Sequence, residues 1–402
     1  MSNTLCVFLT TSGGSTYGTV YDLAANAVGT TTLLMSSAGV KSSAMLTAST
    51  GIVLGATSVA FSVSGTTIAP GAPVTVVGMT LDHALLLSPT QAALVGHTGV
   101  NLLAAAISIA GTTLNIGAAT TVAAMSGAAA APVSCPPIAR SATQIIGVAV
   151  DTGSGVQSKA WHATIAGTVV TANSSVNFGA AALSTTNHSN LVSMALDEWW
   201  LVEGGSGVWK LTVTGANIAA AAGGTAAGIG FSTDPAYPRA AKLNATTLYF
   251  YNITGGANSG WYTGTMSAVA PISQNAVTAS TATAITYAIG GLPSTHIQSG
   301  SMLSYWDETF PGAKTSKKAA IAVPAAENYM CATFGTKDYL FPSSANLGMA
   351  YMVDKAGGNT PYLPIAIPPQ ELGAVGLVFM QSTNKLAWHG PNGRFYCCEV
   401  AL

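Results

Sequence analysis

Charged side chains are scarce in this 402-residue chain. Only 7% of the residues are Asp, Glu, Lys or Arg, whereas globular proteins carry about 25%. The 13 Lys and Arg residues form no basic stripe, and binding to nucleic-acid phosphates needs clustered cations. We therefore expect no nucleic-acid partner. A formal net charge of −1 leaves little repulsion between copies, which favours a homo-oligomer or a place in a larger assembly.

Long apolar runs are missing, although hydrophobic residues make up 49% of the chain. Much of that fraction is alanine, and no run reaches the roughly 18 strongly apolar residues of a membrane-spanning helix. The segment that begins at Met1 has neither a basic stretch nor a cleavage-type site, so no signal peptide is expected. The sequence predicts no membrane insertion and gives no support for secretion by the general pathway.

Signatures of cofactors, metals and nucleophiles are absent as well. The five cysteines match no zinc spacing, and the six histidines are scattered without a His-x-His or His-x-x-x-His pair. No Walker loop, dinucleotide fingerprint, nucleophile elbow or Asp-x-Asp-x-Asp calcium loop occurs. We expect no cofactor, no metal and no catalytic residue, and we predict that the chain is not an enzyme.

Internal repetition is what the chain does contain. An apolar strand followed by a Gly-Thr-Thr turn or a similar turn recurs at residues 59–68, 105–114, 163–170 and 208–218. The turn glycines lie roughly 50 residues apart, and several short strands within such a period are typical of propeller blades. These glycines are Gly65, Gly111, Gly167 and Gly215.

The repeats predict an all-β fold, a β-propeller of about seven or eight blades, each a four-stranded antiparallel sheet. Residues 1–402 are expected to form a single domain. The terminal units look incomplete, and we expect residues 1–35 and 372–402 to close the ring together, which removes free sheet edges. Innermost strands crowd around the axis, so the many Ala, Gly and Ser residues are expected to serve those strands.

Two of the repeat units carry a resemblance to a known group of proteins. Ser64-Gly-Thr-Thr-Ile68 and Ala110-Gly-Thr-Thr-Leu-Asn-Ile-Gly117 resemble degenerate propeller repeats of tailed-phage virion proteins and of surface proteins of aquatic bacteria. The resemblance covers about residues 45–218. It implies a tail-fibre, head-fibre or decoration role, assembly in a host cytoplasm, and other virion proteins and host-surface polysaccharide as partners. No catalytic residue carries over from it.

Acidic pairs beside tryptophan are the candidate binding residues. Asp197-Glu198 precedes Trp199, and Asp307-Glu308 follows Trp306, at what look like matching places in two repeats. Tryptophan rings can stack on sugar faces while carboxylates accept hydrogen bonds from hydroxyl groups, and paired carboxylates also serve glycoside hydrolysis. The alternative is that the acids lie in turns and the rings fill space between blades. The full candidate set is Asp197, Glu198, Trp199, Trp209, Trp261, Tyr262, Trp306, Asp307 and Glu308.

Three functions remain open. The first is a non-enzymatic structural or adhesion protein of a phage virion, in the tail, a fibre or the capsid decoration. The second is a carbohydrate-binding lectin on a bacterial surface, and the third is a glycan-cleaving propeller enzyme. The chain has only three arginines, Arg140, Arg239 and Arg394, which we interpret as isolated salt-bridge or loop residues and not as the carboxylate-binding cluster of a sialidase.

Overall fold

The structure is a computed structural model of the whole chain. It describes residues 5–22, 24–25, 27–126, 129–130, 136–151, 157–178, 190–203, 207–223, 240–252, 260–267, 269–274, 282–288, 294–299, 302–307, 316–322, 329–334, 336–342, 350–354, 362–365, 376–380, 385–389 and 395–399.

The described strands form nine antiparallel sheets, which we number 1 to 9 in chain order. Sheet 1 contains β1 (Leu5–Ser12), β2 (Ser15–Asp22), β3 (Ala27–Val28) and β4 (Thr32–Met35), and sheet 2 contains β5 (Val40–Met45), β6 (Thr50–Gly55), β7 (Thr57–Ser64), β8 (Thr67–Pro70) and β9 (Val74–Thr75). Sheet 3 contains β10 (Thr80–Ser88), β11 (Gln91–Thr98), β12 (Asn101–Ala110), β13 (Thr113–Ile116) and β14 (Thr120–Ala124). Sheet 4 contains β15 (Ala129–Ala130), β16 (Ile138–Ser141), β17 (Gln144–Asp151), β18 (Gln157–Ala166) and β19 (Val169–Phe178).

Sheets 5 to 9 follow the same plan with fewer short strands. Sheet 5 contains β20 (Asn190–Ala195), β21 (Glu198–Glu203), β22 (Gly207–Thr214) and β23 (Asn217–Ala222), and sheet 6 contains β24 (Ala240–Asn244), β25 (Thr247–Asn252), β26 (Gly260–Gly264) and β27 (Val269–Gln274). Sheet 7 contains β28 (Ala282–Ala288), β29 (Ser294–Ser299), β30 (Met302–Asp307) and β31 (Ser316–Ala322), and sheet 8 contains β32 (Tyr329–Phe334), β33 (Lys337–Pro342), β34 (Ala350–Asp354) and β35 (Leu363–Ile365). Sheet 9 contains β36 (Gly376–Met380), β37 (Lys385–His389) and β38 (Phe395–Glu399).

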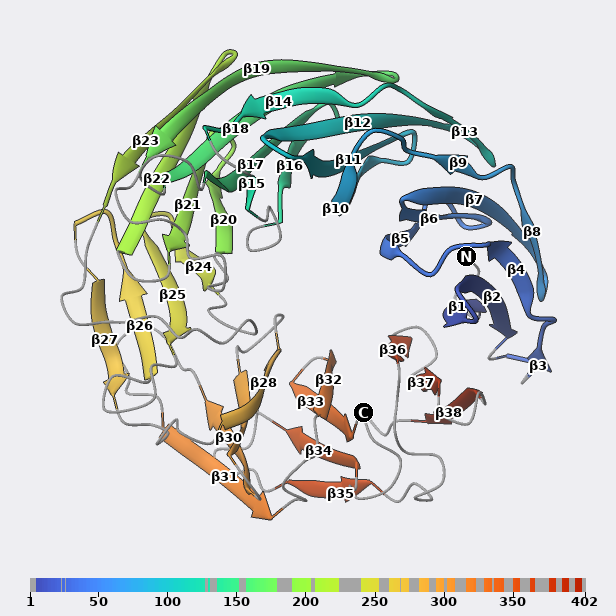
Figure 1. Cartoon of the computed structure of the whole chain (residues 1–402). Helices are drawn as coiled ribbons and strands as arrows, with labels where there is room; N and C mark the ends of the chain where they lie inside the picture. The colour runs from blue at the N-terminus through green and yellow to red at the C-terminus, as the bar shows by residue number, and fades with distance from the viewer. Residues whose placement is uncertain are drawn as a thin grey trace.

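The sheets follow one another around a ring (Figure 1). Strands that begin a sheet, such as β10 and β20, lie toward the middle, and strands that end a sheet, such as β19 and β27, lie on the outside. This is the architecture of a β-propeller, as the repeats predict. The described residues contain no helix. They therefore contain no helix that could cross a membrane.

The number of sheets differs from the predicted seven or eight blades. Among the described residues, the strands at the two ends of the chain do not pair with each other, and joint closure of the ring by residues 1–35 and 372–402 stays a prediction. Residues near the N-terminus form their own hairpin, in which β1 pairs with β2 from Leu5↔Asp22 to Ser12↔Ser15. The C-terminal strands β36, β37 and β38 pair with one another. Each end therefore has local partners, and each adds a sheet to the count.

The repeated glycine turns join the third and fourth strands of sheets 2 to 5, as the sequence predicts. Gly65, Gly111, Gly167 and Gly215 have φ angles of +54°, +61°, +59° and +61°. Side chains disfavour this left-handed region, whereas glycine enters it without steric cost. The turn chemistry explains why the repeat is visible in the sequence.

A second set of glycines connects neighbouring sheets. Gly29, Gly71 and Gly117 each follow a short outer strand, where the fourth strand is interrupted. A Cβ atom on these glycines would lie 1.9, 2.1 and 1.7 Å, respectively, from the carbonyl oxygen of Thr66, Thr112 or Thr168 in the next sheet. Only a residue without a side chain allows this approach, so these positions set how closely adjacent sheets pack.

In sheet 3, small residues lie on other strands than the innermost one, unlike in sheets 2 and 7, whose first strands β5 and β28 have the sequences VKSSAM and ATAITYA. The innermost strand β10 is leucine-rich, with the sequence TLDHALLLS. Completely buried alanines lie instead on the middle strands β11 and β12, at Ala92, Ala93 and residues 104–106. These alanines belong to the core clusters between sheets 2 and 3 and between sheets 3 and 4, so in this part of the ring their small size serves face-to-face packing of sheets.

Candidate functional site

The candidate residue Asp197 lies at the contact between sheets 4 and 5, whereas the side chain of Glu198 lies on the face of sheet 5 opposite to the core residue Trp199. Asp197 is in the turn between β20 and β21, and its side chain is 53% exposed. Its carboxylate accepts hydrogen bonds from Arg140 on β16, at 3.0 Å from Nε and also from Nη2. Arg140 also donates to Gln144 at the start of β17. Arg140 is thus a salt-bridge residue, as we interpreted it from the sequence, and it connects two sheets.

Glu198 begins β21 and is held within its own sheet. Its carboxylate forms an ion pair with Lys210 on β22 and accepts a hydrogen bond of 2.6 Å from the indole Nε1 of Trp200. Partial burial alone would raise the pKa of this carboxyl group. The hydrogen bonds from Lys210 and Trp200, with the positive charge of Lys210, outweigh burial and lower the pKa of Glu198. Glu198 therefore carries its charge at neutral pH and serves as an acceptor.

A buried histidine lies at the same contact between sheets. His162 on β18 has no exposed surface, and its Nδ1 lies 3.2 Å from the carbonyl oxygen of Ala216 in sheet 5. Ser174 on β19 donates to the same oxygen at 2.8 Å and accepts from the backbone N–H of Ile218 at 2.7 Å. The amide nitrogen of Asn173 donates to Thr164 Oγ1 at 2.7 Å and lies 3.2 Å from Nδ1 and 3.4 Å from Nε2 of His162. These polar groups satisfy one another across the contact.

Burial lowers the pKa of His162 below its ordinary value of 6.5. The hydrogen bond to Ala216 opposes this change, and the positive charge of Arg140 adds to the lowering. The imidazole is therefore neutral at pH 7 and can donate through Nδ1 while accepting through Nε2. Asn173 stands six residues after the turn glycine Gly167, where the preceding repeats have Gly71 and Gly117. The polar group at this contact replaces the glycine packing of its neighbours.

The tryptophans of the candidate set serve packing in the described part of sheet 5. Trp199 is 1% exposed and belongs to the core between sheets 4 and 5. The prediction that its ring stacks on a sugar is wrong, because no face of the ring reaches the surface. Trp209 is partly buried against the same core, and its ring lies 5.1 Å from that of Phe178 at an interplanar angle of 57°.

The second acidic pair does not lie at the matching place that the sequence indicated. Asp197 is in the turn between the first and second strands of its sheet, whereas Asp307 ends β30, the third strand of sheet 7. Asp307 pairs with Ser294, and Trp306 pairs with Thr295. Trp261 and Tyr262 lie on β26, opposite Tyr251 and Phe250. The side chains of these four candidates, and Glu308 entirely, lie outside the described residues.

Sequence reasoning missed Lys210 and His162 as members of this polar group. No local motif marks them, since their partners come from other strands. In the described part of the chain, no group of three His, Cys, Asp or Glu side chains could hold a metal ion. These side chains offer hydrogen-bond donors and acceptors in alternation. Asp197 is the most exposed charged residue among them.

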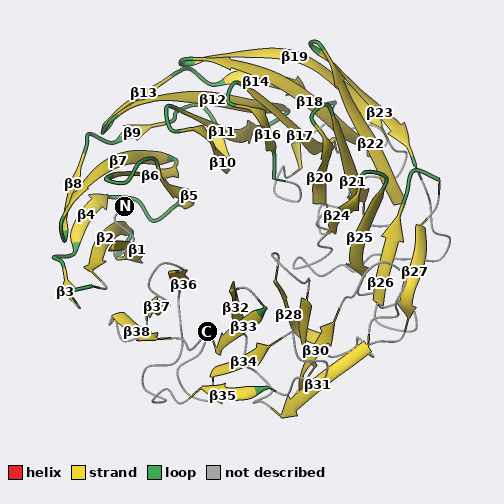
Figure 2. Ribbon diagram, turned by 180° about the vertical axis from the view of Figure 1, so that it is seen from behind, coloured by secondary structure: helices red, strands yellow, loops and turns green. Residues whose placement is uncertain are grey.

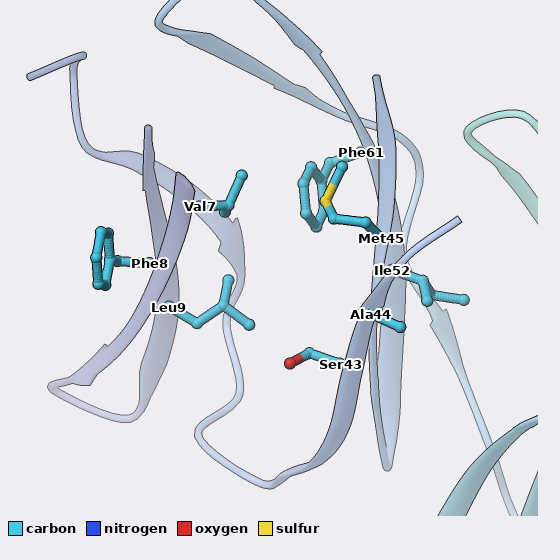
Figure 3. A pocket seen from close by; sticks show the side chains of 8 residues that line it. All are labelled: Val7, Phe8, Leu9, Ser43, Ala44, Met45, Ile52 and Phe61. Atoms are coloured by element: carbon cyan, nitrogen blue, oxygen red, sulfur yellow. The ribbon is translucent and has the colours of Figure 1, made fainter. Parts of the chain in front are cut away.

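A separate cavity of about 320 Å³ lies between sheets 1 and 2 (Figure 3). It is lined by Val7, Phe8, Leu9, Ser43, Ala44, Met45, Ile52 and Phe61. Seven of these eight side chains are apolar, and Ser43 supplies one hydroxyl group. None of them is charged, so the chemistry of this cavity differs from that of the polar group around Asp197.

No protein-family model matches the chain, and no curated protein matches it. Among solved structures, the crystal structure of Saccharomyces cerevisiae Sqt1 is similar, with a TM-score of 0.53 and 9% sequence identity over 89% of this chain and 95% of Sqt1. The C-terminal WD40 domain of Sif2 has a TM-score of 0.50 and 10% identity, over 90% of this chain and 96% of that domain. At such identities the likeness shows the fold alone, which is that of a β-propeller.

Proposed function

We propose that this β-propeller is a non-enzymatic structural and adhesion protein of a phage virion, which packs against other virion proteins and binds a host-surface glycan. One observation carries the proposal. The outer strands of the first six sheets, from β3 and β4 to β23 and β27, contain no Asp, Glu, Lys or Arg. These strands lie on the outside of the ring (Figure 2).

The uncharged outer strands of the first six sheets favour association. Outer strands present backbone N–H and C=O groups, and many proteins use charged side chains, lysine above all, to keep such edges from pairing with other molecules. The outer strands of the first six sheets carry no such charge, whereas β31 of sheet 7 contains Lys317 and Lys318, and the chain as a whole carries a net charge of only −1. A protein that functions inside an assembly gains from this composition, whereas a protein that must stay monomeric would be at risk of aggregation.

Glycan binding is assigned to the polar side chains around the start of β21 in sheet 5. The carboxylates of Asp197 and Glu198 can accept hydrogen bonds from sugar hydroxyls, and Lys210 can donate. Their side chains are 53%, 24% and 33% exposed, so a ligand can reach all three. Each charge has an opposite partner, which suits a neutral polar ligand better than an ionic one.

The first experiment separates binding from turnover. Purified protein is applied to a glycan array and is incubated in parallel with bacterial surface polysaccharides, followed by an assay for new reducing ends. We expect saturable binding and no release. The variants Asp197→Ala and Glu198→Ala should weaken binding at least fivefold, whereas Lys41→Ala, an exposed charge on β5, should not. Reducing ends that disappear in the Asp197→Ala or Glu198→Ala variant would show an enzyme and overturn the proposal.

The second experiment tests the location. Mass spectrometry of density-purified phage particles from the source culture should detect the chain among virion proteins. Detection on cell envelopes alone would instead favour a bacterial surface lectin. Light scattering after size exclusion should show self-association that increases with protein concentration, and a strictly monomeric protein would contradict the assembly role.

A further inference from the structure

The cavity between sheets 1 and 2 suggests a second binding function that goes beyond the proposed function and does not depend on it. We infer that this cavity binds a neutral aliphatic molecule of about twelve carbons, whose single hydroxyl or similar polar end contacts Ser43. The inference rests on the reason that the cavity exists, on the side chains that form its walls, and on its volume.

The cavity arises because sheets 1 and 2 do not match strand for strand. The backbone N–H of Gly29 donates to Val20 on β2, and that of Gly71 donates to Ala60 on β7. These equivalent bonds make β2 the counterpart of β7, and therefore β1 the counterpart of β6. Among the described strands, sheet 1 has no counterpart of β5. The cavity lies where β5, the first strand of sheet 2, faces β1.

The walls come from both sheets and point toward each other. In Figure 3, Val7 and Leu9 on β1 point toward sheet 2, while Met45 and Phe61 point back toward them. Phe8 points to the opposite side of β1, and Ala44 and Ile52 point to the far side of sheet 2. The side chains that face the cavity therefore come from alternate residues of β1 and of β5, as in the packed contacts between the other sheets.

Gly51 holds the aromatic wall in place. It pairs with Phe61 across β6 and β7, and a Cβ atom on Gly51 would lie 2.3 Å from Cζ of the Phe61 ring. The ring therefore lies flat over the glycine. A larger residue at position 51 would push the ring away from β6, so the shape of the cavity depends on this pair.

The lining selects for charge and size. A charged ligand would lose its hydration against the apolar side chains of Val7, Leu9, Met45 and Phe61 without an ionic partner, which is strongly unfavourable. An apolar cavity of about 150 Å³ holds benzene, with six carbons. By proportion, the cavity of about 320 Å³ holds about twelve carbons. Ser43 can donate or accept one hydrogen bond at the end of the chain.

The test uses straight-chain primary alcohols of six to sixteen carbons as probes. They compete with the neutral dye N-phenyl-1-naphthylamine, whose fluorescence reports occupancy. Burial of each CH₂ group contributes about 0.8 kcal/mol, which is about fourfold in affinity. We expect affinity to rise about fourfold per carbon up to about twelve carbons and then to stop rising. Dodecanoate, which is anionic at neutral pH, should bind at least tenfold more weakly than dodecanol.

Two substitutions identify the site. Met45→Trp fills the cavity and should weaken dodecanol binding at least tenfold, whereas Val77→Trp, at a position that is 77% exposed, should leave binding unchanged. If Met45→Trp does not fold, as judged by circular dichroism, Leu9→Phe removes volume from the opposite wall and should give the same loss. Ser43→Ala should reduce affinity for dodecanol severalfold while keeping the chain-length limit.

Some outcomes would overturn the inference. One is the absence of saturable binding by any alcohol. Another is an affinity that continues to rise from twelve to sixteen carbons, which indicates adsorption to the surface. Equal binding by wild type, Met45→Trp and Leu9→Phe would show that the ligand lies elsewhere. None of these results affects the glycan assays, because Asp197→Ala and Glu198→Ala, the variants expected to weaken glycan binding, are in sheet 5.

Discussion

Replacing Gly117 by alanine should separate sheets 3 and 4 locally. The new Cβ atom would lie 1.7 Å from the carbonyl oxygen of Thr168, whereas such contacts essentially never fall below 3.0 Å in proteins. The backbone of sheet 4 must therefore move by more than an ångström. The backbone hydrogen bond of 2.9 Å from Gly117 to Ala106 is strained at the same time.

The magnitude follows from two costs. Overpacking a close contact costs about 1–3 kcal/mol, and here the obstacle is backbone, which cannot rotate away like a side chain. Weakening one backbone hydrogen bond adds about 1 kcal/mol. We expect Gly117→Ala to lower the free energy of unfolding by about 3 kcal/mol. With a urea m-value of about 3 kcal/mol per M, the midpoint shifts by about 1 M.

Urea unfolding followed by tryptophan fluorescence measures this shift. Trp161 is 1% exposed in the core that sheets 3 and 4 share, so its emission reports on the affected contact. Gly39→Ala is the matched control, because the nearest heavy atom to its new Cβ would be Ser37 Oγ at 3.9 Å. That control should keep its midpoint or gain slightly. Equal shifts in both variants would refute the reasoning.

Further predictions concern the polar contacts between sheets. The pKa of His162 is lowered in the folded state, so the unfolded chain binds more protons. The free energy of unfolding should therefore fall as the pH drops below about 6.5. His162→Ala should flatten this pH dependence in urea titrations at pH 5 to 8. A double-mutant cycle on Arg140 and Asp197 should give a coupling of only about 0.2–1 kcal/mol, since the carboxylate is 53% exposed; a coupling above 2 kcal/mol would contradict this view. Asp151→Ala should cost about 3 kcal/mol or more in the same assay, because Asp151 is 3% exposed, forms an ion pair with Lys159 and accepts two hydrogen bonds from Ser126, which lies between β14 and β15.

Features encoded by neighbouring residues are readable from the sequence. The turns at Gly65 and Gly111 can be predicted because a left-handed φ angle favours glycine whatever the rest of the chain does. Alternation and turn spacing then indicate antiparallel strands and a repeat of about 50 residues, and hence a propeller. The salt-bridge role of Arg140 was also anticipated, although its partner Asp197 was not.

The candidate site was only partly predictable. Asp197 and Glu198 stand out because acidic residues are rare in this chain, and the structure places them in a group of polar residues. Trp199 looked equally suitable, but its neighbours along the sequence do not reveal whether an aromatic ring faces solvent or the next sheet. Lys210 and His162 were missed because the residues that give them a role lie on other strands.

Sequence by itself determined the elements of this protein: strands, turns, their antiparallel pairing and an unusually uncharged composition. Tertiary structure decided how the sheets meet. It made nine sheets out of repeats that suggested fewer, brought Gly117 against Thr168, enclosed His162, and left the cavity between Leu9 and Met45. The physical reason is distance along the chain. A turn depends on adjacent residues, whereas contact between sheets depends on register and packing among residues about one repeat apart.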